Sequence, residues 1–208
     1  MRFGVVLDLD GTLVDSVYHH VLAWDAALSR HGHQVPLDRI HRAIGLGGSR
    51  LVTWLLGGQP DDVDALTDAH ETLFLADAER LRPTVGAGAL IDDLQRREVP
   101  TVIATSAQAA IREALLGVLG DPQLPATDAD TVDDAKPSAD LLIASSRQIE
   151  VEPAHAVLIG DSPWDVAAAR RVGMQMIAVR TGGFADSALL ARGPATIVGT
   201  PNDLVGTL

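Results

Sequence analysis

Short runs of apolar, mostly β-branched residues recur along the chain and have the length of buried strands. The predicted strands cover residues 3–8, 100–105, 156–160, 175–180 and 195–198. Longer segments with apolar residues at helical spacing alternate with them, at residues 86–97, 107–118, 138–149 and 162–172. This alternation predicts an α/β fold, in which a doubly wound parallel sheet carries helices on both faces.

The segment between the first two predicted strands interrupts this alternation. It is too long to be a loop, and its apolar residues have helical rather than strand spacing. The spacing is clearest in Leu22, Ala26 and Leu28 and again in Leu51, Val52, Leu55 and Leu56. We therefore predict an α/β core formed by residues 1–14 and 84–208 and a helical cap domain formed by residues 15–83, with connections near residues 14–17 and 80–86.

The composition is that of a globular protein. Of 208 residues, 47% are hydrophobic and 21% charged, enough to bury one core with a smaller insert. The apolar runs are strand-sized and fall short of the roughly 20 residues that span a bilayer. The start, Met1-Arg2-Phe3-Gly4, leads directly into a predicted strand and lacks the three regions of a signal peptide. We expect a cytoplasmic monomer or homodimer that does not bind membranes.

The charge balance restricts the partners. The formal net charge is −12, whereas a nucleic-acid binder needs a basic face to offset phosphate charge. The sequence contains no cysteine, which excludes disulfides, thiolate zinc sites and cysteine nucleophiles. In so acidic a chain, a phosphorylated small molecule would need a local positive site, and a bound cation is the obvious source.

Two aspartates end the first predicted strand, in Asp8-Leu9-Asp10-Gly11-Thr12. Residues two apart on a strand point to the same face, so Asp8 and Asp10 are expected to project together before Gly11 permits a turn. Asp-Gly is also a common turn pair. Taken alone, the segment therefore fits an acidic turn as well as a site.

Polar residues at the ends of other predicted strands favour a functional site over an acidic turn. Thr105 and Ser106 follow the second predicted strand, and Asp161 follows the third. In open parallel sheets, ligands bind outside the carboxyl ends of the strands. Three strands are thus expected to bring five polar residues together, namely Asp8, Asp10, Thr105, Ser106 and Asp161.

A third acidic group, Asp165, follows four residues after Asp161 at the start of a predicted helix. Capping by Asp161 or Ser162, with Pro163 at the first helical position, explains the same pattern and does not exclude metal binding. Asp8, Asp161 and the backbone carbonyl of Asp10, with waters, form the all-oxygen shell that Mg²⁺ favours. We therefore expect Asp8, Asp10 and Asp161 to bind magnesium.

Lys136 is the only lysine among 16 basic side chains. One interpretation is a solvated lysine in the acidic loop that follows Asp133 and Asp134. The other is a compact point charge beside carboxylates and a phosphoryl group, a task for which arginine is not equivalent.

Together, four segments resemble in order and spacing the signature of the haloacid dehalogenase-like superfamily. They are Asp8 to Ser16, Thr105-Ser106, Lys136-Pro137 and Gly160 to Asp165. The position of the predicted cap resembles the subgroup that includes phosphoglycolate phosphatases and β-phosphoglucomutases. One departure is Ala139, which replaces a usual proline two residues after Pro137 and affects helix entry more than chemistry.

The resemblance implies a Rossmann-like core and specific residue roles. Asp8 would attack phosphorus and form an aspartyl-phosphate, and Asp10 would act as general acid and base. Thr105 and Ser106 would bind phosphoryl oxygens, Lys136 would neutralise charge around Asp8, and Asp161 would ligate Mg²⁺. Asp165 would orient Lys136 or a metal-bound water.

Three alternatives to a phosphatase differ from it in the residues that they require. In this family, a true dehalogenase lacks the second aspartate, so Asp10 favours phosphate chemistry. A β-phosphoglucomutase would retain Asp10, and His20 and Trp24 match residues that recur in that subgroup, but residues 51–79 contain no Lys or Arg to replace the mutase's cap lysine. A non-catalytic regulatory protein that kept the fold would not need the intact set of Asp8, Asp10, Lys136 and Asp161.

The cap supplies the remaining candidates for substrate binding. His20 and Arg50 are the candidates we select, and Arg42 and His41 are further candidate ligands for phosphate or carboxylate. Arg50, Arg42 and His41 equally fit a solvated cap surface. The sequence thus predicts a magnesium-dependent phosphatase for a small phosphorylated metabolite, with specificity in the cap.

Overall fold

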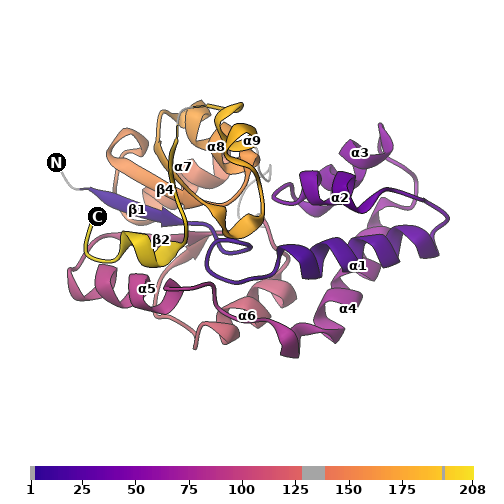
Figure 1. Cartoon of the computed structure of the whole chain (residues 1–208), viewed down its shortest axis with the longest axis horizontal. Helices are drawn as coiled ribbons and strands as arrows, with labels where there is room; N and C mark the ends of the chain where they lie inside the picture. The colour runs from indigo at the N-terminus through magenta and orange to yellow at the C-terminus, as the bar shows by residue number, and fades with distance from the viewer. Residues whose placement is uncertain (1–2, 128–138, 194) are drawn as a thin grey trace.

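A six-stranded parallel sheet forms the centre of the computed structural model, which describes residues 3–127, 139–193 and 195–208. The strand order is β3-β2-β1-β4-β5-β6. Figure 1 labels the neighbouring strands β2, β1 and β4. The strands are β1 (Gly4–Leu7), β2 (Thr101–Ala104), β3 (Ala126–Thr127), β4 (Ala156–Gly160), β5 (Gln175–Val179) and β6 (Thr196–Val198). The predicted doubly wound α/β fold is confirmed.

Apart from short 3-10 helices, one strand and one α-helix of the described residues were not predicted from the sequence. Strand β3 has two residues, too few to produce an alternating pattern, and it pairs only with β2 at the edge of the sheet. Helix α9 (Asp186–Leu190) has five residues, little more than one turn. Both are shorter than the windows in which hydrophobic periodicity can be recognised.

Helices cover both faces of the sheet. On one face lie α5 (Ala87–Arg96), α6 (Ala109–Val118) and the short η5 (Pro201–Leu204), and on the other lie α7 (Ala139–Gln148), α8 (Pro163–Val172) and α9. Successive residues of β1 alternate between the two cores, since Val5 and Leu7 pack on the first and Val6 on the second. Burial on both faces explains why the strands are continuous apolar runs. No helix in the described residues has the length and apolarity needed to cross a bilayer.

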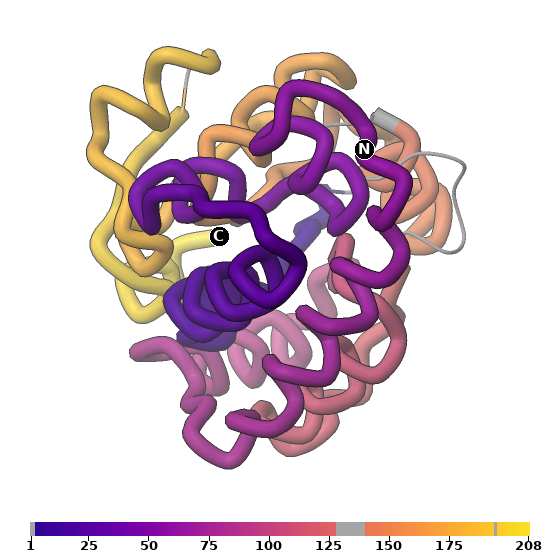
Figure 2. The backbone as a smooth tube through the Cα atoms, turned by 90° about the vertical axis from the view of Figure 1, so that its right-hand side faces the viewer, coloured from indigo at the N-terminus to yellow at the C-terminus, as the bar shows by residue number. Residues whose placement is uncertain are grey.

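Four helices form an insert between β1 and α5, at one end of the molecule (Figure 1). They are α1 (Val17–Arg30), α2 (Leu37–Ala43), α3 (Gly48–Leu56) and α4 (Val63–Ala76), followed by η1 (Ala78–Arg80). Figure 2 views the molecule from this side, with α1 nearly end-on in front of the core. We call α1 to α4 the helical insert.

The buried face of α1 differs from the one that the sequence spacing suggested. Leu22 is 58% exposed, whereas Val17, Val21, Trp24 and Leu28 are buried in the core of the insert. Both sets have helical spacing, so the pattern of α1 alone did not identify the face that α4 covers.

The two connections of the insert are hydrogen-bonded to each other. The Asp15 N–H donates to the Arg82 carbonyl at 2.9 Å, and the Thr84 N–H donates to the Leu13 carbonyl at 2.9 Å. The Thr84 hydroxyl also donates to the Thr12 carbonyl at 2.7 Å. The return of the insert to the core is therefore attached directly to the segment that follows Asp10.

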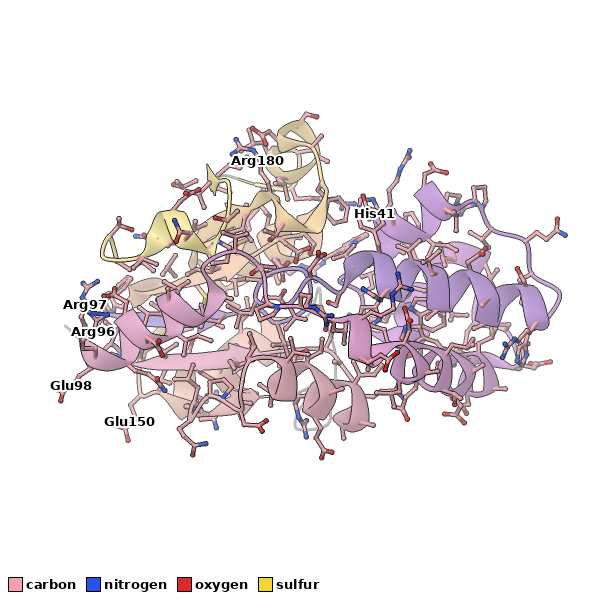
Figure 3. The ribbon with its side chains drawn as sticks, turned by 60° about the horizontal axis from the view of Figure 1, so that its bottom comes forward. His41, Arg96, Arg97, Glu98, Glu150 and Arg180 are labelled. Carbon is pink, nitrogen blue, oxygen red and sulfur yellow. The ribbon has the colours of Figure 1, made fainter. Side chains whose placement is uncertain are left out.

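At the opposite end of the core, Asp93 ties α5 to the C-terminal segment. This buried carboxylate accepts hydrogen bonds from the Gly206 N–H at 3.0 Å, Arg96 at 3.0 Å and Arg97 at 3.1 Å. Figure 3 shows Arg96 and Arg97 at the end remote from the insert. The Gly206 N–H, followed by the Arg97 guanidinium, holds the pKa of Asp93 below its ordinary value against the opposing effect of burial.

We predict that Asp93→Asn destabilises the protein in a pH-dependent way. Because the pKa of Asp93 is lower in the folded than in the unfolded chain, its stabilising effect is present above the unfolded pKa of about 4 and is lost as the pH falls through the folded value. Urea denaturation should therefore show a larger loss of unfolding free energy at about pH 7 than at about pH 3.

The matched control is Asp92→Asn, the same change at the neighbouring exposed residue. Its free energy of unfolding should stay close to that of the wild type at both pH values. A loss for Asp93→Asn that is equal at both pH values would contradict the linkage.

Candidate active site

The candidate site lies where the order of the strands reverses. From β1 the chain continues to β2 and β3 on one side, and then returns to β4 on the other side of β1. Asp8 follows β1 and Asp161 follows β4, and these strands are paired in parallel with Leu7 opposite Ile159. Parallel sheets bind ligands at such a switch point, outside the carboxyl ends of the strands.

Three buried carboxylates meet at this point. Oxygen atoms of Asp8, Asp161 and Asp165 all lie within 4.8 Å of one another. The Thr12 hydroxyl lies 2.9 Å from Asp8 Oδ2 and 3.3 Å from Asp161 Oδ1, and its single proton is donated to one of them at a time. Like charges this close repel one another, so the cluster favours a bound cation.

Two glycines make room for the Asp161 carboxylate. A Cβ atom at Gly182 would lie 1.9 Å from Asp161 Oδ2, and one at Gly11, which has a φ of +72°, would lie 2.4 Å from it. At Gly11 and Gly182 the backbone thus approaches this carboxylate more closely than a residue with a Cβ atom would allow. The ligand atoms of this cluster are carboxylate oxygens, and an all-oxygen set fits Mg²⁺.

Asp165 also caps α8. Its Oδ2 accepts hydrogen bonds from the Ser162 N–H at 3.0 Å and the Ser162 hydroxyl at 2.6 Å, and the Asp165 N–H donates back to Ser162 Oγ at 3.3 Å. This capping box, with Pro163 at the first helical position, fixes the start of the helix. Capping and proximity to the acidic cluster therefore coexist in one residue.

The Asp10 carboxylate has different neighbours from those of Asp8. Its Oδ1 accepts a hydrogen bond from the Ser16 hydroxyl at 2.7 Å, and His20 Nε2 lies 2.7 Å from the same atom. The Gly11 N–H in turn donates to Ser16 Oγ at 3.2 Å. The side chain of Asp10 is thus directed to the start of α1.

His20 continues this network to a residue that the sequence did not single out. His20 Nδ1 lies 3.0 Å from Nε2 of His70, which is 5% exposed on α4. The available signal was spacing, because His70 and Phe74 are four residues apart, as are His20 and Trp24. Burial, and to a lesser extent the neighbouring His20 ring, holds the pKa of His70 well below its ordinary value.

A cavity of about 60 Å³ lies between the core and the insert. Its polar lining includes Asp8, Asp10, His20, His70, Ser106, Gln108 and Asp161, and its apolar lining includes Trp24, Ile44, Leu46, Leu51 and Ile111. Both candidate catalytic aspartates therefore face one space, which the insert partly encloses.

The other predicted site residues do not all line the cavity. Ser106 lines the cavity, whereas Thr105 is buried and its Oγ1 accepts a hydrogen bond from the Ala107 N–H at 3.0 Å, so its own proton remains available for donation. Arg50 is half-buried on α3 and lies outside the cavity lining. Lys136 lies outside the described residues.

His41 and Arg42 lie where the insert meets the core, and Figure 3 shows His41 at this junction. His41 Nε2 lies 2.9 Å from the Gly182 carbonyl, and its ring stacks on Phe184 at a centroid distance of 4.5 Å. The Trp164 indole N–H donates to the Arg42 carbonyl at 3.0 Å, while the Arg42 side chain pairs with Asp38 at the surface. These contacts attach α2 to the core beside Asp161.

Comparison with known proteins agrees with this arrangement. A fructose-1-phosphate phosphatase from Escherichia coli is 30% identical over 190 residues, which cover 85% of this chain and 96% of that protein. A phosphoglycolate phosphatase from Rhodospirillum rubrum is 32% identical over 197 residues, which cover 88% of this chain and 81% of that protein. The crystal structure of a hydrolase from Pseudomonas syringae superposes with a TM-score of 0.94 at 28% identity, covering 98% of this chain and 96% of that one.

The description of one family matches most of the chain. The match is to haloacid dehalogenase-like hydrolases and extends over residues 4–173, from β1 to the end of α8. With the candidate residues at the carboxyl ends of β1, β2 and β4, this match shows that the chain belongs to the haloacid dehalogenase-like hydrolase family.

Proposed function

We propose that this protein is a magnesium-dependent phosphatase that hydrolyses a small phosphorylated metabolite through an aspartyl-phosphate on Asp8. The proposal rests on the observation that two carboxylates, those of Asp8 and Asp10, line one cavity but have different neighbours. Asp8 belongs to the acidic cluster, and Asp10 is held by Ser16 and His20. The relatives named as phosphatases of fructose 1-phosphate and phosphoglycolate support this reaction class.

Asp8 is the proposed nucleophile. It is 4% exposed at the end of a central strand, and its backbone N–H donates to the Ile159 carbonyl at 2.9 Å. The Thr12 hydroxyl at 2.9 Å fixes the rotation of the carboxylate. A carboxylate held in this way can attack phosphorus in line with the leaving oxygen, since phosphoryl transfer depends mainly on positioning and electrostatics.

Asp8, Asp161 and the Asp10 carbonyl are the proposed holders of Mg²⁺, with Asp165 beside them. When bound, the ion supplies positive charge that offsets the repulsion between a phosphate dianion and these carboxylates, roughly 4 kcal/mol for each close pair of unit charges at an effective dielectric near 20. Thr105 and Ser106 are proposed to bind phosphoryl oxygens, and Lys136 to neutralise charge near Asp8.

Asp10 is the proposed general acid and base. Its Oδ1 faces two groups able to donate, Ser16 Oγ and His20 Nε2, each at 2.7 Å. The proton that is transferred to the leaving oxygen is therefore assigned to Oδ2. In the second half of the reaction, the same oxygen takes a proton from the water that hydrolyses the aspartyl-phosphate.

The cavity favours hydrolysis over a mutase reaction. A mutase must hold the second phosphate of a bisphosphate intermediate, for which cationic side chains are the usual ligands. Among the described residues, the cavity lining includes no lysine or arginine. We further propose that residues 15–83 act as a cap domain over a core formed by residues 1–14 and 84–208, and that His20 and Arg50 contribute to substrate binding.

The first prediction from the proposed function concerns the nucleophile. Asp8→Asn should lower kcat for an aryl phosphate by about 1,000-fold or more, because a neutral amide does not attack phosphorus. Circular dichroism should show an unchanged fold. The exposed, remote Asp92→Asn serves as the control and should keep wild-type turnover. Undiminished turnover by Asp8→Asn would contradict the mechanism.

The second prediction concerns the metal. EDTA should abolish turnover, and added Mg²⁺ should restore it. Asp161→Asn should raise the Mg²⁺ concentration needed for half-maximal activity by more than roughly 10-fold. Loss of a residue that only hydrogen-bonds to a metal ligand already weakens metal binding by about that factor, and Asp161 is proposed to be a direct ligand. Independently of activity, Mg²⁺ should raise the Tm of the wild-type protein more than that of Asp161→Asn. Turnover that is insensitive to EDTA would rule out the metal requirement.

The third prediction separates hydrolase from mutase. Incubation with β-glucose 1-phosphate and its bisphosphate should release any phosphate that reacts as inorganic phosphate. Formation of glucose 6-phosphate without a matching amount of free phosphate would show that the protein is a mutase instead.

A further inference from the structure

Helices α1 and α4 interlock through four rings. The His20 ring stacks on Phe74 at a centroid distance of 4.0 Å, and Trp24 stacks on His70 at 4.1 Å. Each helix presents its pair four residues apart, so the same face of each helix supplies both rings. All four side chains are buried. The rotation of the His70 ring is therefore fixed by the packing of Trp24 against it.

This packing aligns a hydrogen-bonded chain that leads from the insert to Asp10. His70 Nε2 lies 3.0 Å from His20 Nδ1, and His20 Nε2 lies 2.7 Å from Asp10 Oδ1. The His20 ring thus has a partner at both nitrogens, one on α4 and the other in the core. His20 therefore provides a direct route by which His70 can affect Asp10.

The identity of the donors follows from the groups around Asp10 Oδ1. Ser16 Oγ accepts the Gly11 N–H at 3.2 Å and directs its own proton to Oδ1 at 2.7 Å. Oδ1 is therefore an acceptor, and His20 matches it with a proton on Nε2. A neutral His20 with its proton on Nδ1 would instead direct a lone pair at Oδ1. The tautomer of His20 consequently decides which oxygen of Asp10 carries a proton.

We propose that His70 is a positioning residue that acts through His20. By donating its Nε2–H to His20 Nδ1, His70 selects the His20 tautomer that carries its proton on Nε2. Asp10 Oδ1 then remains an acceptor, and the transferable proton of Asp10 lies on Oδ2. The inference rests on the proposed role of Asp10 as general acid. A neutral His70 can make this donation, and its lowered pKa is consistent with the neutral form. The helical insert thus contributes to acid catalysis through His70 and His20.

Two variants of His70 separate its hydrogen bond from its packing. His70→Phe keeps a ring between Trp24 and Phe74 and removes both nitrogens. His70→Gln loses the ring but keeps an amide N–H that can donate at the position of Nε2. His31→Phe makes the same chemical change at an exposed histidine at the end of α1 and is the control.

The readout compares two phosphate esters that differ in leaving group. Glycerol 2-phosphate has a poor alkoxide leaving group that needs protonation, whereas 4-nitrophenyl phosphate has a good leaving group that needs little. General acid catalysis contributes about 100-fold or more, so His70→Phe should lower kcat/KM for the alkyl ester by about 10- to 100-fold and for the aryl ester by less than about 3-fold. His70→Gln should lie within about 3-fold of the wild type for both esters.

A second readout does not depend on activity. In the nitrogen–proton correlation spectrum of the imidazole rings, His20 of the wild-type protein should show a proton on Nε2. In His70→Phe the His20 signals should move toward a mixture of tautomers, and in His70→Gln they should stay as in the wild type. The His31→Phe spectrum should leave the His20 signals unchanged.

Several outcomes would overturn the inference. Equal losses for the two esters in His70→Phe, or equal losses in His70→Phe and His70→Gln, would assign His70 a purely structural role. If the wild-type protein hydrolyses neither ester while His20 behaves as expected, the proposed phosphatase function fails and the His70–His20 contact stands. An unchanged His20 tautomer in His70→Phe overturns the inference whether or not the protein is active.

Discussion

Three buried carboxylates lie close together in the candidate site, and their mutual repulsion must be offset. Asp8, Asp161 and Asp165 are each at most 4% exposed, and their oxygens lie within 4.8 Å of one another. The parallel pairing of β1 with β4 fixes this spacing, because Leu7 lies opposite Ile159 and the two strands end together. The sheet, which is stable through burial on both faces, therefore holds charges together that would separate in a flexible loop. A bound divalent cation would offset their repulsion and, in the proposed reaction, would allow a phosphate dianion to approach them.

The same segment gives its second carboxylate different surroundings. Gly11, with a φ of +72°, turns the chain after Asp10, and the close approach of Asp161 excludes any larger residue there. The turn directs Asp10 to Ser16 and His20, whereas Asp8 stays with the acidic cluster. Carboxylates two residues apart thus have separate environments, which is how similar groups come to take different parts in a reaction. The division of roles proposed for Asp8 and Asp10 depends on this turn.

The sequence was informative where local pattern and parallel-sheet geometry sufficed. Asp8, Ser106 and Asp161 were predicted to meet because each follows an apolar run, and in the structure all three line one cavity. Contacts between distant elements could not be predicted in this way. His70 lies 50 residues from His20, and Gly182 approaches Asp161 only because β5 pairs with β4. The exposed Leu22 has the same cause, since two faces of α1 have helical spacing and only the packing of α4 selects one. Lys136 lies outside the described residues.

The contacts that hold the insert over the cavity also determine the surroundings of Asp10. The insert begins at Ser16, directly after the turn, and its far end returns through Thr84, which bonds to the carbonyls of Thr12 and Leu13. On the other side, His41 and the Arg42 carbonyl attach it to the core beside Asp161. Asp10 belongs to the core and His20 to the insert, so a displacement of the insert that opens the cavity also alters the 2.7 Å contact between them. Access of water and placement of the acid are therefore governed by the same set of contacts. Under the mechanism proposed for Asp10, its acid–base geometry would be complete only while the insert encloses the cavity, and phosphoryl transfer would be restricted to a substrate that has displaced bulk water.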